Sequence, residues 1–350
     1  MTDQRPIPGP SGKRQRCIVH IGLNKTGSTT IQGWLQINRD ALRKQGIWHD
    51  SLAPHGGPHL STAAGWAIYA HSQRPNYVPG GWQAQSYRIG SRAELQDRLD
   101  QFLTRVEATF PPADEGTYVT SSEHIGAGIK NVPEMEKLHS WFAARFDEVR
   151  YVVYIREQTD WVASAYVQAV RSGMTDSLDA YIERFGLNDY HTLVQKWCGV
   201  AGAGNVDVRL FDKAAFAGGD LIDDFASAIG ADASQTRRPP RLNDSMPLYQ
   251  LNLLLWTSRL FGKAIEKLGL IRAQRRFYSR NMPFLFGSTR RLRLSPDQAA
   301  RVRAMNAEGN EALRALVFPA EDSLFPGASN TPSSRPAQGV AAAIPQVTGQ

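Results

Sequence analysis

Short apolar runs that alternate with helical patterns constrain this chain more than any other feature of its sequence. Helical spacing follows each of four strand-like runs, which are CIVHIGL (17–23), GTYVTSS (116–122), VRYVVYI (149–155) and NVDVRLF (205–211). Apolar strands that alternate with helices are typical of a parallel sheet covered on both faces. We therefore expect an α/β fold of three layers, with a central parallel sheet flanked by helices.

The pattern between the runs places the helices. Ile31, Leu35, Asn38 and Leu42 recur on one face of a helix that Gly46 is expected to end. Thr159 or Asp160 is expected to cap a helix at 159–173. Further helices are predicted at 133–146, 213–230, 246–268 and 295–317. Residues 50–95 are rich in Gly, Pro, His and Trp, which predicts an insertion with short helices on the substrate side.

Length and composition set the domain organisation. The 350 residues suffice for one large or two modest domains. We expect a single α/β domain over 16–326, between a disordered segment at 1–15 and a disordered tail at 327–350. The formal net charge of +7 suits an anionic ligand and is too mild to require nucleic acid.

The sequence shows no clear targeting segment and no metal-binding motif. Its N-terminus lacks the apolar core of a secretory signal, and no apolar run reaches the length of a membrane span, so we expect a cytoplasmic protein. The two cysteines, Cys17 and Cys198, lie far apart and form no CxxC motif. We therefore expect neither a zinc site nor any other metal.

The segment HIGLNKTGSTTIQGW (20–34) joins the first predicted strand to the first predicted helix. The N–H groups at the start of a helix bind anions, and the helix dipole favours negative charge there. Lys25 adds an ammonium group, and hydroxyl donors come from Thr26, Ser28, Thr29 and Thr30. The triphosphate-binding pattern G-x-x-x-x-G-K-[ST] fails, because Val19 and Asn24 stand where its glycines are required. The loop suits a shorter anion, such as one 5′-phosphate with a group attached.

HIGLNKTGSTTIQ resembles the 5′-phosphosulfate-binding loop of sulfotransferases, whose core reads approximately P-K-T/S-G-T-T. Asn24 replaces the usual proline, and Ser28 replaces the common threonine. The resemblance implies a P-loop NTPase-like sulfotransferase fold that uses 3′-phosphoadenosine-5′-phosphosulfate as its donor and no metal. It also implies that the donor is bound by Asn24, Lys25, Thr26, Gly27, Ser28, Thr29 and Thr30. Lys25 is then the catalytic cation over the bridging oxygen, where negative charge develops.

A second sulfotransferase signature lies in YVVYIREQTDWVASAYVQ, where Arg156 closes the third predicted strand and Ser164 follows eight residues later. In sulfotransferases the matching arginine and serine bind the 3′-phosphate of the donor. The planar guanidinium of arginine suits phosphate oxygens. SSEHI (121–125), AYVQAVRSG (165–173) and LSPDQAARV (294–302) resemble the bacterial, carbohydrate-sulfotransferase-like branch.

Sulfuryl transfer also needs a base that accepts the proton of the attacking group. Glu123 is the first candidate because it follows the second predicted strand, and the C-terminal ends of parallel strands face the ligand crevice. His124 and His59 are alternatives that the sequence leaves open.

The predicted function is transfer of a sulfuryl group to a hydroxyl or amine of an acceptor, with a carbohydrate or glycolipid favoured. Two alternatives are a P-loop kinase or nucleotide hydrolase, and a catalytically inactive sulfotransferase-like binding protein. The sequence leaves open the acceptor, the oligomeric state and the role of the basic stretch from Lys267 to Arg293, which contains no Asp or Glu.

Overall fold

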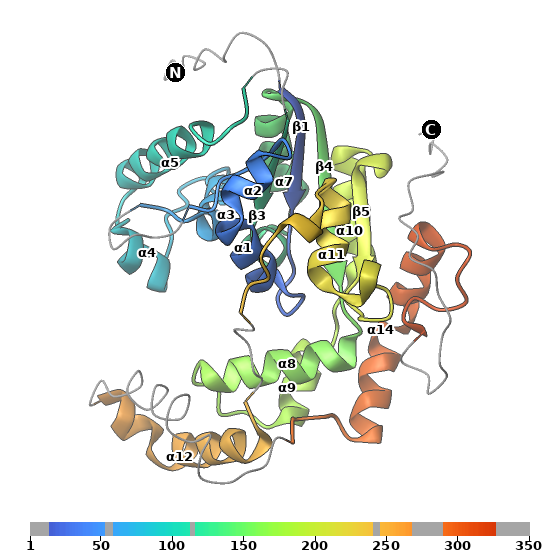
Figure 1. Cartoon of the computed structure of the whole chain (residues 1–350). Helices are drawn as coiled ribbons and strands as arrows, with labels where there is room; N and C mark the ends of the chain where they lie inside the picture. The colour runs from blue at the N-terminus through green and yellow to red at the C-terminus, as the bar shows by residue number, and fades with distance from the viewer. Residues whose placement is uncertain (1–13, 53–58, 113–115, 241–245, 268–289, 327–350) are drawn as a thin grey trace, which may run out of the picture. The chain divides into compact units, whose positions relative to one another are not determined.

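The computed structural model describes residues 14–52, 59–112, 116–240, 246–267 and 290–326, which form two compact units (Figure 1). The sheet unit contains Met1–Ile155, His191–Pro240 and Leu313–Gln350. The helical unit contains Arg156–Tyr190 and Arg241–Ala312. That the two units fold together as one domain stays a prediction. Residues 1–13 of the segment predicted to be disordered, the predicted tail at 327–350 and the part of the basic stretch between 268 and 289 lie outside the described residues. Residues 14 and 15 of that N-terminal segment belong to the first strand.

A five-stranded, all-parallel sheet forms the centre of the sheet unit, with the strand order β2-β3-β1-β4-β5. The strands are β1 (Arg14–His20), β2 (Ile47–His49), β3 (Thr117–Ser121), β4 (Phe146–Ile155) and β5 (Val206–Leu210). In the sheet register, His20 of β1 lies beside Ser121 of β3. The C-terminal ends of these two strands therefore meet at one edge of the sheet.

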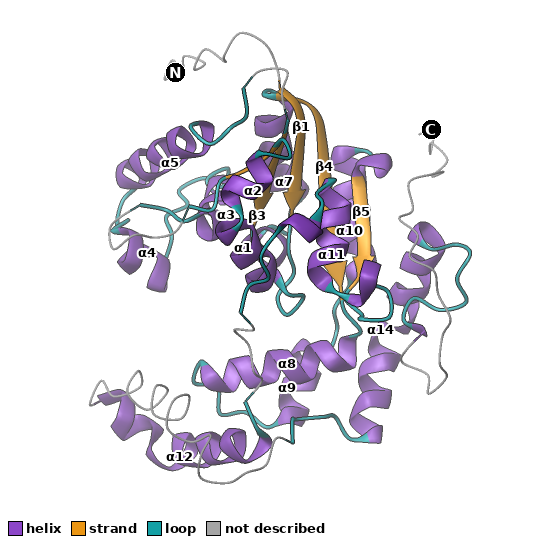
Figure 2. Cartoon of the chain, in the orientation of Figure 1, coloured by secondary structure: helices purple, strands orange, loops and turns teal. Residues whose placement is uncertain are grey.

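Helices cover both faces of this sheet (Figure 2). The helices of the sheet unit are α1 (Ser28–Ile37), α2 (Arg39–Arg43), α3 (Thr62–His71), α4 (Gly81–Tyr87), α5 (Arg92–Glu107), α6 (Glu123–Gly128), α7 (Val132–Ala143), α10 (Tyr190–Ala201) and α11 (Leu221–Ile229). Short 3₁₀ turns lie at Ala203–Asn205, Ala217–Gly219 and Ala233–Gln235. This architecture confirms the predicted α/β fold with a parallel sheet between two helical layers.

Alternate residues of each strand point to opposite faces of the sheet, and apolar side chains lie on both. On one face, Ile18 packs with Trp34 of α1 and Phe225 of α11. On the opposite face, the ring centroids of Tyr151 and Trp197 are 4.6 Å apart. All five side chains are buried. Burial on both faces explains why the strands read as continuous apolar runs in the sequence.

The helical unit contains α8 (Gln158–Arg171), α9 (Leu178–Phe185), α12 (Leu248–Lys267) and α14 (Pro296–Val317) up to Ala312. Val162 and Tyr166 of α8 share a core with Ile182, Leu254 and Val302. Among the described residues, no helix of either unit is long and apolar enough to cross a membrane.

Several predicted boundaries are wrong. β1 ends at His20 instead of residue 23, and the three-residue strand β2 was not predicted. The helix expected to run past Leu42 breaks at Asn38, whose buried side chain contacts the backbone of Arg237. Neither Thr159 nor Asp160 caps α8, because the N-cap is Glu157.

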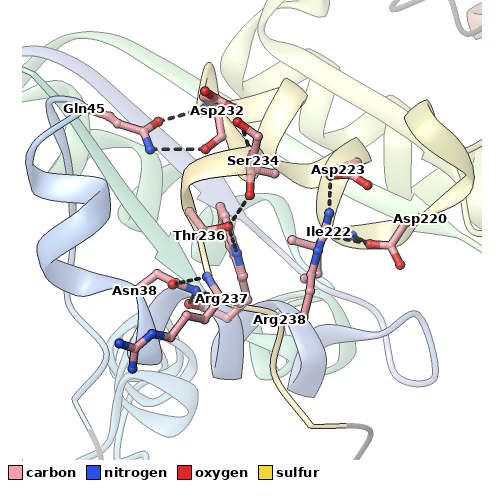
Figure 3. Close-up of polar contacts among 12 residues, drawn as sticks. Asn38, Gln45, Asp220, Ile222, Asp223, Asp232, Ser234, Thr236, Arg237 and Arg238 are labelled. Carbon is pink, nitrogen blue, oxygen red and sulfur yellow. Dashed lines mark hydrogen bonds and ion pairs between the residues drawn. The ribbon is translucent and has the colours of Figure 1, made fainter.

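Polar contacts fix α1 and α2 against the segment that follows α11 (Figure 3). Asn38 accepts a hydrogen bond from the Arg237 N–H at 2.7 Å and donates to its carbonyl at 2.9 Å. Gln45 makes the same pair of contacts with the backbone of Asp232, at 2.8 and 3.2 Å. Trp34 Nε1 also donates to Thr236 Oγ1 at 3.0 Å. The C-terminal half of α1 is thus anchored to the segment that follows α11.

Candidate functional site

The turn between β1 and α1 has an unusual backbone. Lys25 has φ 69° and Gly27 has φ 79°, both in the left-handed region. This conformation is uncommon for residues other than glycine and costs Lys25 about 1–2 kcal/mol. Such strain persists only where the surroundings enforce it, and it clusters at functional sites. The backbone of Lys25 therefore marks this turn as a candidate site independently of its sequence.

Gly27 is the N-cap residue of α1 and makes no side-chain capping hydrogen bond. A Cβ atom at this position would lie 2.3 Å from Leu221 Cδ2 and 2.9 Å from Phe211 Cε2. Only glycine fits here without a shift of these side chains. Because the first N–H groups of a helix have no intrahelical acceptor, those of Ser28 and Thr29 are suited to bind an anion.

The hydroxyl groups predicted as anion ligands have different surroundings. Thr26 is completely buried, and its hydroxyl donates to the Leu23 carbonyl at 2.7 Å, so it braces the turn. Ser28 is also buried, whereas Thr29 is exposed and Thr30 is half-buried. The predicted cation Lys25 is half-buried, and its neighbour Asn24 is exposed.

The end of β3 and the start of α6 pack directly against this turn. Ser122 N–H donates to the His20 carbonyl at 3.1 Å, and Gly126 N–H donates to the Ile21 carbonyl at 2.8 Å. A Cβ atom on Gly22 would lie 3.1 Å from Glu123 Cα. Two segments about 100 residues apart in the sequence thus form one compact structure, with Glu123 beside the turn.

Glu123 is connected to α1 by a residue that the sequence analysis missed. Gln32 Nε2 donates to Glu123 Oε2 at 2.6 Å and also lies 3.5 Å from the Ser121 carbonyl oxygen. Gln32 stands one helical turn after Ser28, beside the apolar stripe of α1. Its position next to the residues predicted to bind the anion is the signal that could have identified it.

His20 supports this arrangement from inside the sheet unit. Its Nδ1 and Ser121 Oγ are 2.8 Å apart, and its ring packs on Tyr154 and Phe225. The ring is fully buried, and this burial lowers the pKa of His20 to about 3. His20 is therefore neutral at physiological pH, where it fixes the side chain at the end of β3.

The two other candidate bases differ in their surroundings. His124 follows Glu123 in α6 and is half-buried. His59 is exposed and precedes α3. Within the described part of the chain, no hydrogen bond or ion pair joins His59 to the turn before α1. The structure thus places Glu123 and His124 next to this turn and gives His59 no link to it.

Arg156 and Ser164 belong to the helical unit. Arg156 directly follows β4, and its guanidinium lies 3.7 Å from the carboxylate of Asp160. Ser164 is half-buried in α8, one helical turn beyond Asp160. Glu157 caps this helix, because its carboxylate accepts the backbone N–H groups of Thr159 and Asp160 at 2.9 and 3.1 Å.

No protein-family model matches this chain. A curated protein of Archaeoglobus fulgidus, described as uncharacterized, is 29% identical over 107 residues, which cover 31% of this chain and 29% of that protein. The match thus spans less than a third of the length of either protein.

Two solved structures are similar to this chain. A sulfotransferase from Alicyclobacillus acidocaldarius shows 13% identity over 87% of this chain and 95% of that one, with a TM-score of 0.42. A sulfotransferase domain from the curacin biosynthetic pathway shows 12% identity over 63% and 76%, with a TM-score of 0.35. The case for a function therefore depends on the residues of the site itself.

Proposed function

We propose that this chain transfers the sulfuryl group of 3′-phosphoadenosine-5′-phosphosulfate to a hydroxyl or amine of an acceptor, with a carbohydrate or glycolipid as the favoured class. One observation carries the proposal. The start of α1 has no side-chain cap, lies beside a strained lysine, and is connected by Gln32 to the carboxylate of Glu123. In this proposal the start of α1 would be the anion site, Lys25 the cation and Glu123 the base. The likeness of HIGLNKTGSTTIQ to a phosphosulfate-binding loop supports this donor.

The start of α1 would bind the 5′-phosphosulfate of the donor. The N–H groups of Ser28 and Thr29 and the positive end of the helix dipole would face its oxygens. Lys25 would stabilise the negative charge that develops on the bridging oxygen. Arg156 and Ser164 are proposed to bind the 3′-phosphate, as the second sequence signature implies.

The transfer is a single displacement at sulfur. The acceptor oxygen or nitrogen forms a bond to sulfur while the bond between sulfur and the 5′-phosphate oxygen breaks. The bonding electrons leave with adenosine 3′,5′-bisphosphate, and Glu123 takes the proton of the acceptor. We favour Glu123 over His124 and His59 because Gln32 holds its carboxylate next to the turn.

Calorimetry tests the donor class. We expect binding of adenosine 3′,5′-bisphosphate without magnesium, and weaker binding by Lys25→Ala. Lys44→Ala is a matched control, because Lys44 is exposed at the end of α2, outside the turn. Binding of Mg-ATP alone would overturn the proposal and favour a kinase or nucleotide hydrolase.

A transfer assay with glycans, lipids and small phenols tests the reaction and its acceptor class. Loss of a general base costs about 10²- to 10⁴-fold in turnover, and we expect a loss of this order for Glu123→Gln. Its affinity for the bisphosphate should stay unchanged. Tight bisphosphate binding without transfer to any acceptor would instead indicate an inactive binding protein.

A further inference from the structure

Gln32 makes two contacts that no role in donor binding requires. Its Nε2 lies 2.6 Å from Glu123 Oε2 and 3.5 Å from the carbonyl oxygen of Ser121. An amide nitrogen carries two hydrogens, so it can donate to both oxygens at once. Gln32 therefore joins α1 to the last residue of β3 and the first residue of α6.

The elements on both sides of this connection are rigidly held. α1 is anchored through Asn38 to the backbone of Arg237. At the other side, the Ser121 hydroxyl contacts the buried His20, and Gly126 N–H donates to the Ile21 carbonyl. A side chain that bridges two fixed elements has little freedom itself. The carboxylate it contacts is therefore held in one orientation relative to the start of α1.

The side-chain amide of Gln32 is a suitable hydrogen-bond donor for a carboxylate that acts as a base. Gln32 donates a hydrogen bond to Oε2 of Glu123. No described residue donates a hydrogen bond to Oε1, so this second oxygen can receive a proton. A neutral amide leaves the negative charge of the carboxylate in place, whereas an arginine or lysine at the same position would offset it. An amide also does not compete for the proton at neutral pH.

We propose that Gln32 is a positioning residue for sulfuryl transfer, which holds Oε2 of Glu123 so that Oε1 faces the reacting group of the acceptor. This inference rests on the proposed function, because the base there is Glu123. Gln32 acts through Glu123 and does not itself touch the substrate.

The first test separates turnover from binding. Misplacing a catalytic group by about 1 Å costs on the order of 100-fold in rate, so we expect Gln32→Leu to lower kcat by about 10- to 100-fold. The affinity for adenosine 3′,5′-bisphosphate should stay within about twofold, since the donor-binding N–H groups are unchanged. Gln36→Leu is the matched control, because Gln36 is exposed on the same helix one turn further on.

A double-mutant cycle with Glu123→Gln distinguishes positioning from a structural role. If Gln32 acts only through Glu123, then Gln32→Leu causes no further loss of kcat in the Glu123→Gln background. An equal loss in both backgrounds would overturn the inference and indicate damage to the fold. Thermal unfolding of all four proteins reports any such damage directly.

Binding and transfer by the wild-type chain distinguish a failure of the proposed function from a failure of the positioning role alone. A wild-type chain that binds no bisphosphate and transfers no sulfuryl group overturns both. A wild-type chain that transfers the group, together with a Gln32→Leu variant that matches its kcat, overturns only the positioning role.

Discussion

Two strand-to-helix junctions of this chain begin their helices in opposite ways. α1 follows β1 through the left-handed Gly27, and no described side chain caps its first turn. α8 follows β4 through Glu157, whose carboxylate accepts the N–H groups of Thr159 and Asp160. Within the described chain, the first N–H groups of α8 thus have an internal carboxylate as partner, whereas those of α1 have none.

The two junctions would bind a phosphate group through different chemical groups. At α1 the backbone N–H groups and Lys25 can act together, as at other helix-terminal anion sites. At α8 the backbone groups are used by Glu157, so the proposed binding of the 3′-phosphate would depend on the side chains of Arg156 and Ser164. The turn before α1 and the start of α8, which the sequence assigns to the same donor, therefore differ in the groups that they offer to a phosphate.

Among substitutions in the two junctions themselves, the largest effect is expected for Lys25→Ala, before α1. Loss of one group that stabilises transition-state charge costs about 10²- to 10³-fold in kcat. Single-turnover transfer at saturating donor measures this loss, with Lys44→Ala as the control. A loss confined to donor affinity would show that Lys25 binds the ground state and does not stabilise the transition state.

The next effect concerns His20, which supports the junction before α1. Burial lowers the pKa of His20 from its usual 6.5 to about 3, so between these values the unfolded chain binds a proton that the folded chain does not. The free energy of unfolding should therefore fall as the pH drops from about 6.5 toward 3, by up to about 1.4 kcal/mol per pH unit.

Urea unfolding of the wild type and His20→Asn between pH 4 and 7 measures this dependence. The slope against pH should be smaller in the variant. The buried groups His49, with a pKa lowered to about 4, and Asp50, with a pKa raised to about 6, titrate in the same range in both proteins. Their contribution cancels in the comparison, so equal slopes would contradict the role given to His20.

A smaller effect is expected at the junction before α8, for Arg156→Ala. A hydrogen bond to a charged group contributes about 1.5–3 kcal/mol, which corresponds to a loss of roughly 10- to 100-fold in bisphosphate affinity. The kcat at saturating donor should change little, because Arg156 is assigned to the non-reacting phosphate. Arg171→Ala, at an exposed position in the last turn of α8, is the control for calorimetry.

The smallest effect is expected for Glu157→Ala, which removes the cap of α8. Loss of an N-cap side chain costs about 0.5–2 kcal/mol of stability. Urea unfolding should detect this loss, while bisphosphate affinity should not fall. A drop in affinity comparable to that of Arg156→Ala would show that the carboxylate orders the binding residues, and the contrast between the junctions would need revision.

The fold was largely predictable because its signal is local. Burial on both faces made β1, β3, β4 and β5 visible as apolar runs. β2 was missed because three residues, Ile47–His49, are too few to show a period. The break at Asn38 was missed because its cause, the backbone of Arg237, lies 199 positions away in the sequence.

Local patterns in the sequence were enough to locate the lysine turn, the run of hydroxyls and the arginine after β4. The contacts of these groups follow from the folded chain, which buries Thr26, caps α8 with Glu157 and joins Gln32 to Glu123, 91 positions away. The starts of strands and helices are set by local periodicity, whereas a hydrogen bond between distant segments forms only once the sheet has set their register.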